Sequence, residues 1–148
     1  MNLQEKVTEL SKIYSASPIA ASSYAQNGKI YFLENGIPAK KLENARKKFV
    51  LREGETIIYF YDQTFRGTGD QGFCVTDKTI YWRRTALSRA QSVPLAEIAD
   101  IKRELHDEDR NDYHIMIYTG KANLDTWIDA DSMIFDFLKE VFSILRVN

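Results

Sequence analysis

Apolar and polar positions follow two different periods along the chain, and the period changes near residue 54. Before it, apolar residues recur every three or four positions, which predicts amphipathic helices at residues 2–14 and 38–50 with a brief strand at 30–33. After it, short apolar runs with a period of two predict strands. The seven predicted strands span residues 56–62, 72–76, 79–84, 90–94, 98–105, 113–119 and 123–128.

Short connections join these strands and carry turn residues such as Gly67, Gly69 and the Gly120-Lys121 pair. Closely spaced strands with hairpin links predict an antiparallel meander that curls into a barrel or sandwich. A final helix follows, and Asp129 or Asp131 can cap it. The sequence therefore predicts an α+β, mainly β, fold with residues 1–53 as a helical N-terminal extension and 54–148 as the main domain.

The final helix is apolar over more than half its circumference. Such a wide apolar face requires burial on two sides, one against the sheet and one against a cover. The cover is either the N-terminal helices or another subunit. We therefore expect an interaction surface that includes Phe135, Phe142 and Leu145.

Several segments are similar to pleckstrin-homology-like (PH-like) domains, and the chain resembles bacterial PH-like proteins of unknown function. The resemblance rests on Gly54-Glu55, residues 61–64, 69–73, 75–82 and 93–98, and it covers about residues 54–146. It implies seven antiparallel strands closed by a C-terminal helix. It leaves the ligand open, because barrels of this kind have many unrelated roles.

Composition narrows the classes of function. The chain has 148 residues and a net charge of -1, which argues against a nucleic-acid binder that depends on overall charge. A single cysteine precludes an internal disulfide and favours a reducing compartment. Neither a signal peptide nor an apolar run of about 18 residues is present, so we expect a cytoplasmic protein without an integral membrane segment.

Candidate catalytic and metal-binding motifs are weak. Residues 67–72 match the dinucleotide pattern G-x-G-x-x-G, but a strand rather than a helix follows. Residues 107–112 begin like a calcium loop, yet they fit a charged hairpin tip better than a weak cation site. His106, His114 and Cys74 lack zinc-site spacing, although a Cys74–His114 pair stays open. We expect no catalytic residue, cofactor or metal.

Basic residues give an alternative function. Arg66 lies in the first hairpin loop, and Arg83, Arg84 and Arg89 lie at and after the third strand. Convergent arginines suit phosphate groups, and the basic helix at 38–50 can assist in peripheral membrane contact. The family's Lys-x(n)-Lys/Arg-x-Arg pattern is absent. The main expectation is thus a non-catalytic domain for protein binding or self-assembly, and the alternative is recognition of an anionic lipid or phosphate ligand.

Overall fold

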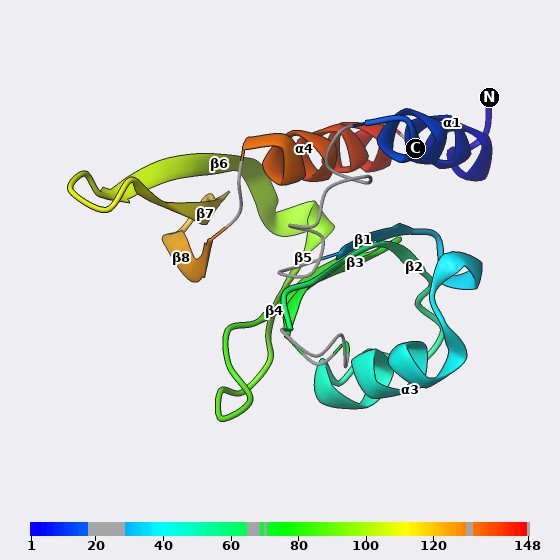
Figure 1. Cartoon of the computed structure of the whole chain (residues 1–148), viewed down its shortest axis with the longest axis horizontal. Coiled ribbons are helices and arrows are strands. Elements are labelled where there is room, and N and C mark those ends of the chain that lie inside the picture. Colours follow the sequence, from blue (N-terminus) through cyan, green and yellow to red (C-terminus); the bar gives the residue numbers. More distant parts are fainter. Residues whose placement is uncertain (18–28, 65–68, 70, 130–131, 148) are drawn as a thin grey trace.

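The computed structural model describes residues 1–17, 29–64, 69, 71–129 and 132–147. Figure 1 shows the arrangement of its elements. The three α-helices in the described residues are α1 (Leu3–Ser15), α3 (Ala39–Lys48) and α4 (Ser132–Arg146). The strands are β1 (Lys29–Phe32), β2 (Ile57–Asp62), β3 (Gly72–Thr76), β4 (Thr79–Arg83), β5 (Gln91–Pro94), β6 (Ile98–Asp107), β7 (Asp112–Thr119) and β8 (Asn123–Asp129). Short 3-10 turns occupy Glu34–Gly36 and Leu95–Glu97.

The strands form two antiparallel sheets. The first has the order β1-β2-β3-β4-β5 and the second the order β6-β7-β8. The expectation of an α+β, mainly β, fold with a C-terminal helix is therefore confirmed. Within the described residues the two ladders are separate and do not close into a barrel. β1, from the expected N-terminal extension, pairs with β2 and adds an eighth strand.

The first sheet is buried on both faces, which explains why its central strands read as continuous apolar runs. On one face, Phe60 and Cys74 pack with Ala45 and Phe49 of the α3 segment. On the other face, the sheet shares a core with α1, α4 and the second sheet. An irregularity in the β2–β3 register between Ile57 and Tyr59 places these two residues, two positions apart, in the cores on opposite faces of the sheet.

The apolar face of α4 is covered within the chain by α1. Tyr14 of α1 meets Phe137 of α4 edge to face, with ring centroids 5.4 Å apart. Figure 1 shows α1 and α4 along the same side of the first sheet, opposite α3. The sequence left two candidates for the cover of α4, the N-terminal helices and another subunit. In the described structure the cover is α1.

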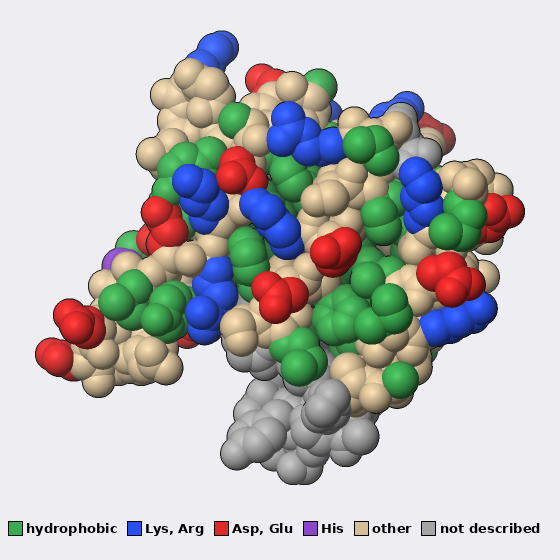
Figure 2. Space-filling view, turned by 90° about the horizontal axis from the view of Figure 1, so that it is seen from above, with side chains coloured by type: hydrophobic (Ala, Val, Ile, Leu, Met, Phe, Trp, Pro, Cys, Tyr) green, Lys and Arg blue, Asp and Glu red, His purple; other side chains and the backbone are tan. Residues whose placement is uncertain are grey.

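This packing corrects the expected interaction surface on α4. Phe142 is 3% exposed and belongs to the core, and Arg146 lies over its ring. Phe135 and Leu145 are half-buried against the same core. Seen from above, Lys, Arg, Asp and Glu side chains are interspersed with apolar ones on this side of the molecule (Figure 2). Phe142 therefore contributes almost no apolar surface to this side of the molecule.

The start of α4 also differs from one expectation. Asp129 lies at the end of β8 and does not cap the helix, which begins at Ser132. The other predicted cap, Asp131, lies outside the described residues. Asp129 instead takes part in the polar cluster described below.

Two buried carboxylates tie the first sheet to its surroundings. Glu55 is 6% exposed and accepts hydrogen bonds from Thr76, Thr79 and Tyr81, at 2.7, 3.0 and 2.8 Å. Asp62 of β2 pairs with Lys41 of α3 at 2.8 Å. Lys41 of the predicted basic helix therefore forms an internal ion pair and does not belong to a free basic surface.

Candidate functional site

Three of the four predicted arginines, Arg83, Arg84 and Arg89, lie in or beside the loop between β4 and β5. Arg83 is 7% exposed, and its guanidinium donates to the carbonyls of Ser88 at 3.0 Å and Ala86 at 2.6 Å. Its guanidinium is therefore engaged in holding the loop, and its role as a ligand residue stays a prediction. Arg84 and Arg89 are exposed, whereas Arg66 lies outside the described residues.

Hydroxyl groups give the same loop a defined shape. The Thr85 Oγ1 atom lies 2.8 Å from Ser88 Oγ and accepts from the Leu87 backbone amide at 3.3 Å. This pattern is typical of turns in which a threonine hydroxyl, in place of a backbone carbonyl, accepts a hydrogen bond from a nearby backbone amide. The loop therefore presents Leu87, which is 98% exposed, from a fixed backbone.

The second sheet meets this loop through Trp127 of β8. The guanidinium of Arg84 lies over the Trp127 ring, 4.9 Å from its centroid. Trp127 is 45% exposed, an unusual position for so large an aromatic side chain. Arg84, Leu87, Arg89 and Trp127 together are called the loop–Trp127 surface below.

A histidine pair packs against the Trp127 ring. His106 of β6 and His114 of β7 stack with ring centroids 4.1 Å apart, and the Trp127 centroid lies 4.7 and 4.9 Å from theirs. His114 is only 4% exposed. Three carboxylates contact this pair, and we call the whole group the His114 cluster: His106, Asp112, His114, Asp125 and Asp129.

Carboxylates face both nitrogens of His114. Nδ1 lies 3.0 and 3.1 Å from the two carboxylate oxygens of Asp125. Nε2 lies 3.4 Å from Asp112 Oδ2 and 3.6 Å from Asp129 Oδ1. Desolvation and a hydrogen bond that the protonated Asp129 donates to Asp112 raise the pKa of Asp129 to about 6. The same hydrogen bond lowers the pKa of Asp112. Two carboxyl groups are therefore held close together beside one imidazole.

An irregularity in β8 brings these groups together. Met116 pairs with Asp125, so a regular hairpin would place Trp127 opposite His114. Asp129 occupies that position instead, because β8 contains two additional residues between the paired positions. Trp127 has a φ of 58°, and its amide donates to Asp125 at 2.7 Å. The irregularity lets Asp125 and Asp129 both reach one histidine.

Sequence reasoning missed this cluster. It compared the histidines with the single cysteine and did not include carboxylates from a neighbouring strand. Asp112 and His114 are two positions apart in a predicted strand, so the sequence alone placed their side chains on the same face of that strand. The shift in register that places Asp129 opposite His114 has no simple sequence signal, since a regular pairing gives a different partner.

Other candidate chemistry is not supported by the geometry. Cys74 is fully buried beneath α3, and burial raises the pKa of its thiol, so it does not act as a ready nucleophile. Residues 107–112 form the β6–β7 hairpin tip, as expected. Gly72, the third glycine of the G-x-G-x-x-G match, opens strand β3, so the motif lacks the helix that a dinucleotide site requires.

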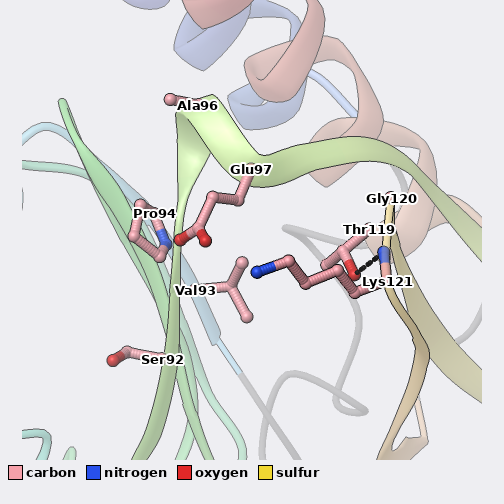
Figure 3. Close-up of a pocket in the computed structure, with 8 residues that line it drawn as sticks. All are labelled: Ser92, Val93, Pro94, Ala96, Glu97, Thr119, Gly120 and Lys121. Atoms are coloured by element: carbon pink, nitrogen blue, oxygen red, sulfur yellow. Dashed lines mark hydrogen bonds between the residues drawn. The ribbon is translucent and has the colours of Figure 1, made fainter.

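A separate hollow lies between the β5–β6 corner and the β7–β8 turn. The Glu97 and Lys121 side chains extend toward one another across it (Figure 3). It is lined by Ser92, Val93, Pro94, Ala96, Glu97, Thr119, Gly120 and Lys121. This lining contains neither histidine nor cysteine.

Comparison with known proteins gives no match to a protein-family model, to a curated protein or to a solved structure. Among the described helices, none has both the length and the apolarity required to cross a membrane. The loop–Trp127 surface and the His114 cluster are therefore the candidate sites among the described residues.

Proposed function

We propose that this chain is a non-catalytic, PH-like interaction module of the bacterial cytoplasm that binds a protein partner. Strands β2–β5, then β6–β8, then α4 follow the strand and helix order of a PH-like domain. The observation that carries the proposal is Leu87, which is 98% exposed on a loop held in shape by buried Arg83. An apolar side chain on an ordered loop suits a contact surface.

The surroundings of Leu87 favour a protein contact. Tryptophan and arginine are the residue types most enriched at binding hot spots, and Arg84 stacks on Trp127 next to the loop. The stacked pair presents a rigid apolar plane together with hydrogen-bond donors. An ordered surface of this kind loses little conformational entropy on binding.

An anionic membrane is a weaker candidate for the partner. Each cation near an anionic surface contributes about 1 kcal/mol, so Arg84 and Arg89 together contribute about 2 kcal/mol, or about 30-fold. Asp129 lies within the electrostatic reach of Arg84 and opposes that attraction. Membrane-binding basic segments carry about four to eight cations. The charges of the loop–Trp127 surface therefore favour a protein partner over an anionic membrane.

Self-assembly also needs a different surface from the one expected. The apolar face of α4 motivated that idea, and α1 covers this face within the same chain. A second copy of the chain is still one possible protein partner of the loop–Trp127 surface. Light scattering across a concentration series separates this case from binding to a different protein.

Site-specific photo-crosslinking tests the proposal directly. Benzoylphenylalanine in place of Leu87 is expected to give one dominant crosslinked species in native extract, and untagged wild-type protein is expected to compete it away. The matched control places the same probe at Ile13, which is 62% exposed on α1, and α1 lies away from the β4–β5 loop (Figure 1). The control is expected to give no such species.

Two variants identify the contact and its partner class. Untagged Leu87→Glu protein is expected not to compete with the probe-carrying protein for the crosslinked partner. Untagged Ile13→Glu protein is expected to compete like the wild type. A second arm measures co-sedimentation with vesicles containing phosphatidylserine over a salt series. Salt-sensitive vesicle binding that requires Arg84, without a protein crosslink at position 87, would replace the protein partner with an anionic membrane. Equal crosslinking at positions 87 and 13 would refute the proposed surface.

A further inference from the structure

Three side chains of the second sheet converge on one nitrogen of the buried His114. Asp112 and His114 alternate along β7, and Asp129 of β8 lies opposite His114 in the ladder. Their ligand atoms all lie within 4.8 Å of one another. We propose that Asp112, His114 and Asp129 bind a divalent transition-metal ion of the Zn²⁺ type. This proposal is independent of the protein partner proposed above.

Asp125 sets the tautomer that a metal requires. Its two carboxylate oxygens lie 3.0 and 3.1 Å from His114 Nδ1, and because a carboxylate accepts, the tautomer with the proton on Nδ1 donates a hydrogen bond to Asp125. The lone pair of His114 is then on Nε2, which faces the other two carboxylates. A carboxylate that orients a histidine from behind is the usual support of a metal-binding imidazole. Asp125 is therefore a positioning residue.

The distances around Nε2 match a tetrahedral ion. Zinc binds imidazole nitrogen at about 2.0–2.1 Å and carboxylate oxygen at about 2.0–2.2 Å, which separates adjacent ligand atoms by about 3.3–3.5 Å at tetrahedral angles. The observed separations from Nε2 are 3.4 Å to Asp112 Oδ2 and 3.6 Å to Asp129 Oδ1. Two of the three ligand separations therefore match those around a bound ion, and the third, between Asp112 and Asp129, is within 4.8 Å.

The ligand types select among divalent ions. An imidazole with two carboxylates suits Zn²⁺ and similar transition-metal ions, whereas Mg²⁺ prefers six oxygen ligands including several waters. The ion also places a positive charge between a nitrogen lone pair and two acidic groups that otherwise face each other. Three protein ligands leave a fourth position for water or for a group from another molecule.

A second possible set of ligands, His106, His114 and Asp125, fits less well. The two imidazole rings are inclined by only 13° with centroids 4.1 Å apart. An imidazole binds a metal in its own ring plane, and two nearly parallel stacked rings share no such point. His106 therefore packs against His114, and the ion belongs on the Nε2 side.

Isothermal titration of the full chain with Zn²⁺ tests the site. The wild type is expected to bind one ion per chain, and Asp129→Asn and Asp112→Asn are each expected to weaken binding by at least about tenfold. Asp129 has a side chain that is 65% exposed, so its replacement leaves the fold intact. Asp109→Asn, on the exposed hairpin tip, is the matched control and is expected to bind like the wild type.

Two further measurements make the assignment specific. Co²⁺ in place of Zn²⁺ is expected to give the intense visible absorption of a tetrahedral ion, and Mg²⁺ is expected not to compete. Asp125→Asn is expected to weaken Zn²⁺ about 10–100-fold although it is not a ligand. Absence of one-to-one binding, or unchanged affinity in Asp129→Asn, would overturn the proposal. Loss of binding in His106→Ala with Asp129→Asn unaffected would assign the ion to the other set and overturn it as well.

Discussion

The buried carboxylate of Glu55 gives the sharpest test of how the first sheet is held together. Its two oxygens accept hydrogen bonds from three hydroxyl groups, those of Thr76, Thr79 and Tyr81. In Glu55→Gln the amide oxygen can still accept from Thr76 and Tyr81, but it no longer carries a charge. The amide nitrogen replaces the oxygen that faces Thr79, so that hydroxyl must reverse its role.

The expected loss follows from these three contacts. A hydrogen bond to a charged group contributes about 1.5–3 kcal/mol, and one to a neutral group about 0.5–1.5 kcal/mol. Losing about 1 kcal/mol at each of the three contacts predicts that Glu55→Gln lowers the free energy of unfolding by about 3 kcal/mol. Glu53→Gln is the matched control, because Glu53 is exposed two residues away and its change is expected to stay within about 0.5 kcal/mol.

Urea unfolding at several pH values measures both the size of the effect and its cause. Burial acts to raise the pKa of Glu55, but the three hydroxyl hydrogen bonds outweigh it, and the net pKa is lowered from 4.5. The stability from this group is therefore fully present above about pH 4.5 and is lost as the pH falls through the lower, folded-state pKa. Glu55→Gln should flatten this part of the acid limb.

Two results would refute this reasoning. A Glu55→Gln variant within about 0.5 kcal/mol of the wild type at pH 7 would show that the carboxylate charge contributes little. A large loss at pH 7 with an unchanged acid limb would show that packing, and not ionisation, is responsible.

Three other substitutions test separate contacts. Lys41→Met leaves Asp62 buried without its cation and is expected to cost about 3–5 kcal/mol by urea unfolding, and a loss below about 1 kcal/mol would contradict the pair. Gly72→Ala places a methyl carbon 1.9 Å from a carbonyl oxygen of β2 at a φ of +124°, so a loss above about 3 kcal/mol is expected, whereas Gly36→Ala, with open space around it, should be mild. Arg83→Ala removes two hydrogen bonds from the β4–β5 loop, so amide exchange there should accelerate at least about tenfold while exchange in β2 stays unchanged.

Local patterns predicted the elements well because their causes are local. The period of two and the turn residues located the strands from β2 to β8 within about two residues, and a period near 3.6 located α1, α3 and α4. Strand β1 was predicted as well, but its pairing with β2 was not, because pairing joins residues about 30 positions apart. Contacts between distant segments decided most of what the sequence left open.

Single residues of the candidate site show the same limit of prediction from sequence. Arg83 and Arg84 are neighbours in the chain with the same charge, yet one is buried in its own loop and the other is exposed over Trp127. Phe142 was expected on a surface, but it is buried in the core that α4 shares with α1 and both sheets, whose strands and helices are far apart in the sequence. The His114 cluster depends on a two-residue irregularity in β8 that brings Asp129 into register.

The packing of α1 on α4 has a consequence for how the chain folds. These helices lie at residues 3–15 and 132–146, so the shared core closes only after nearly all of the described chain is available. Contacts between such distant segments slow folding, because a large loop must close before they form. On the ribosome, the apolar side of α1 therefore stays without its partner until residues 132–146 have been synthesised, which makes a chaperone most useful during that interval.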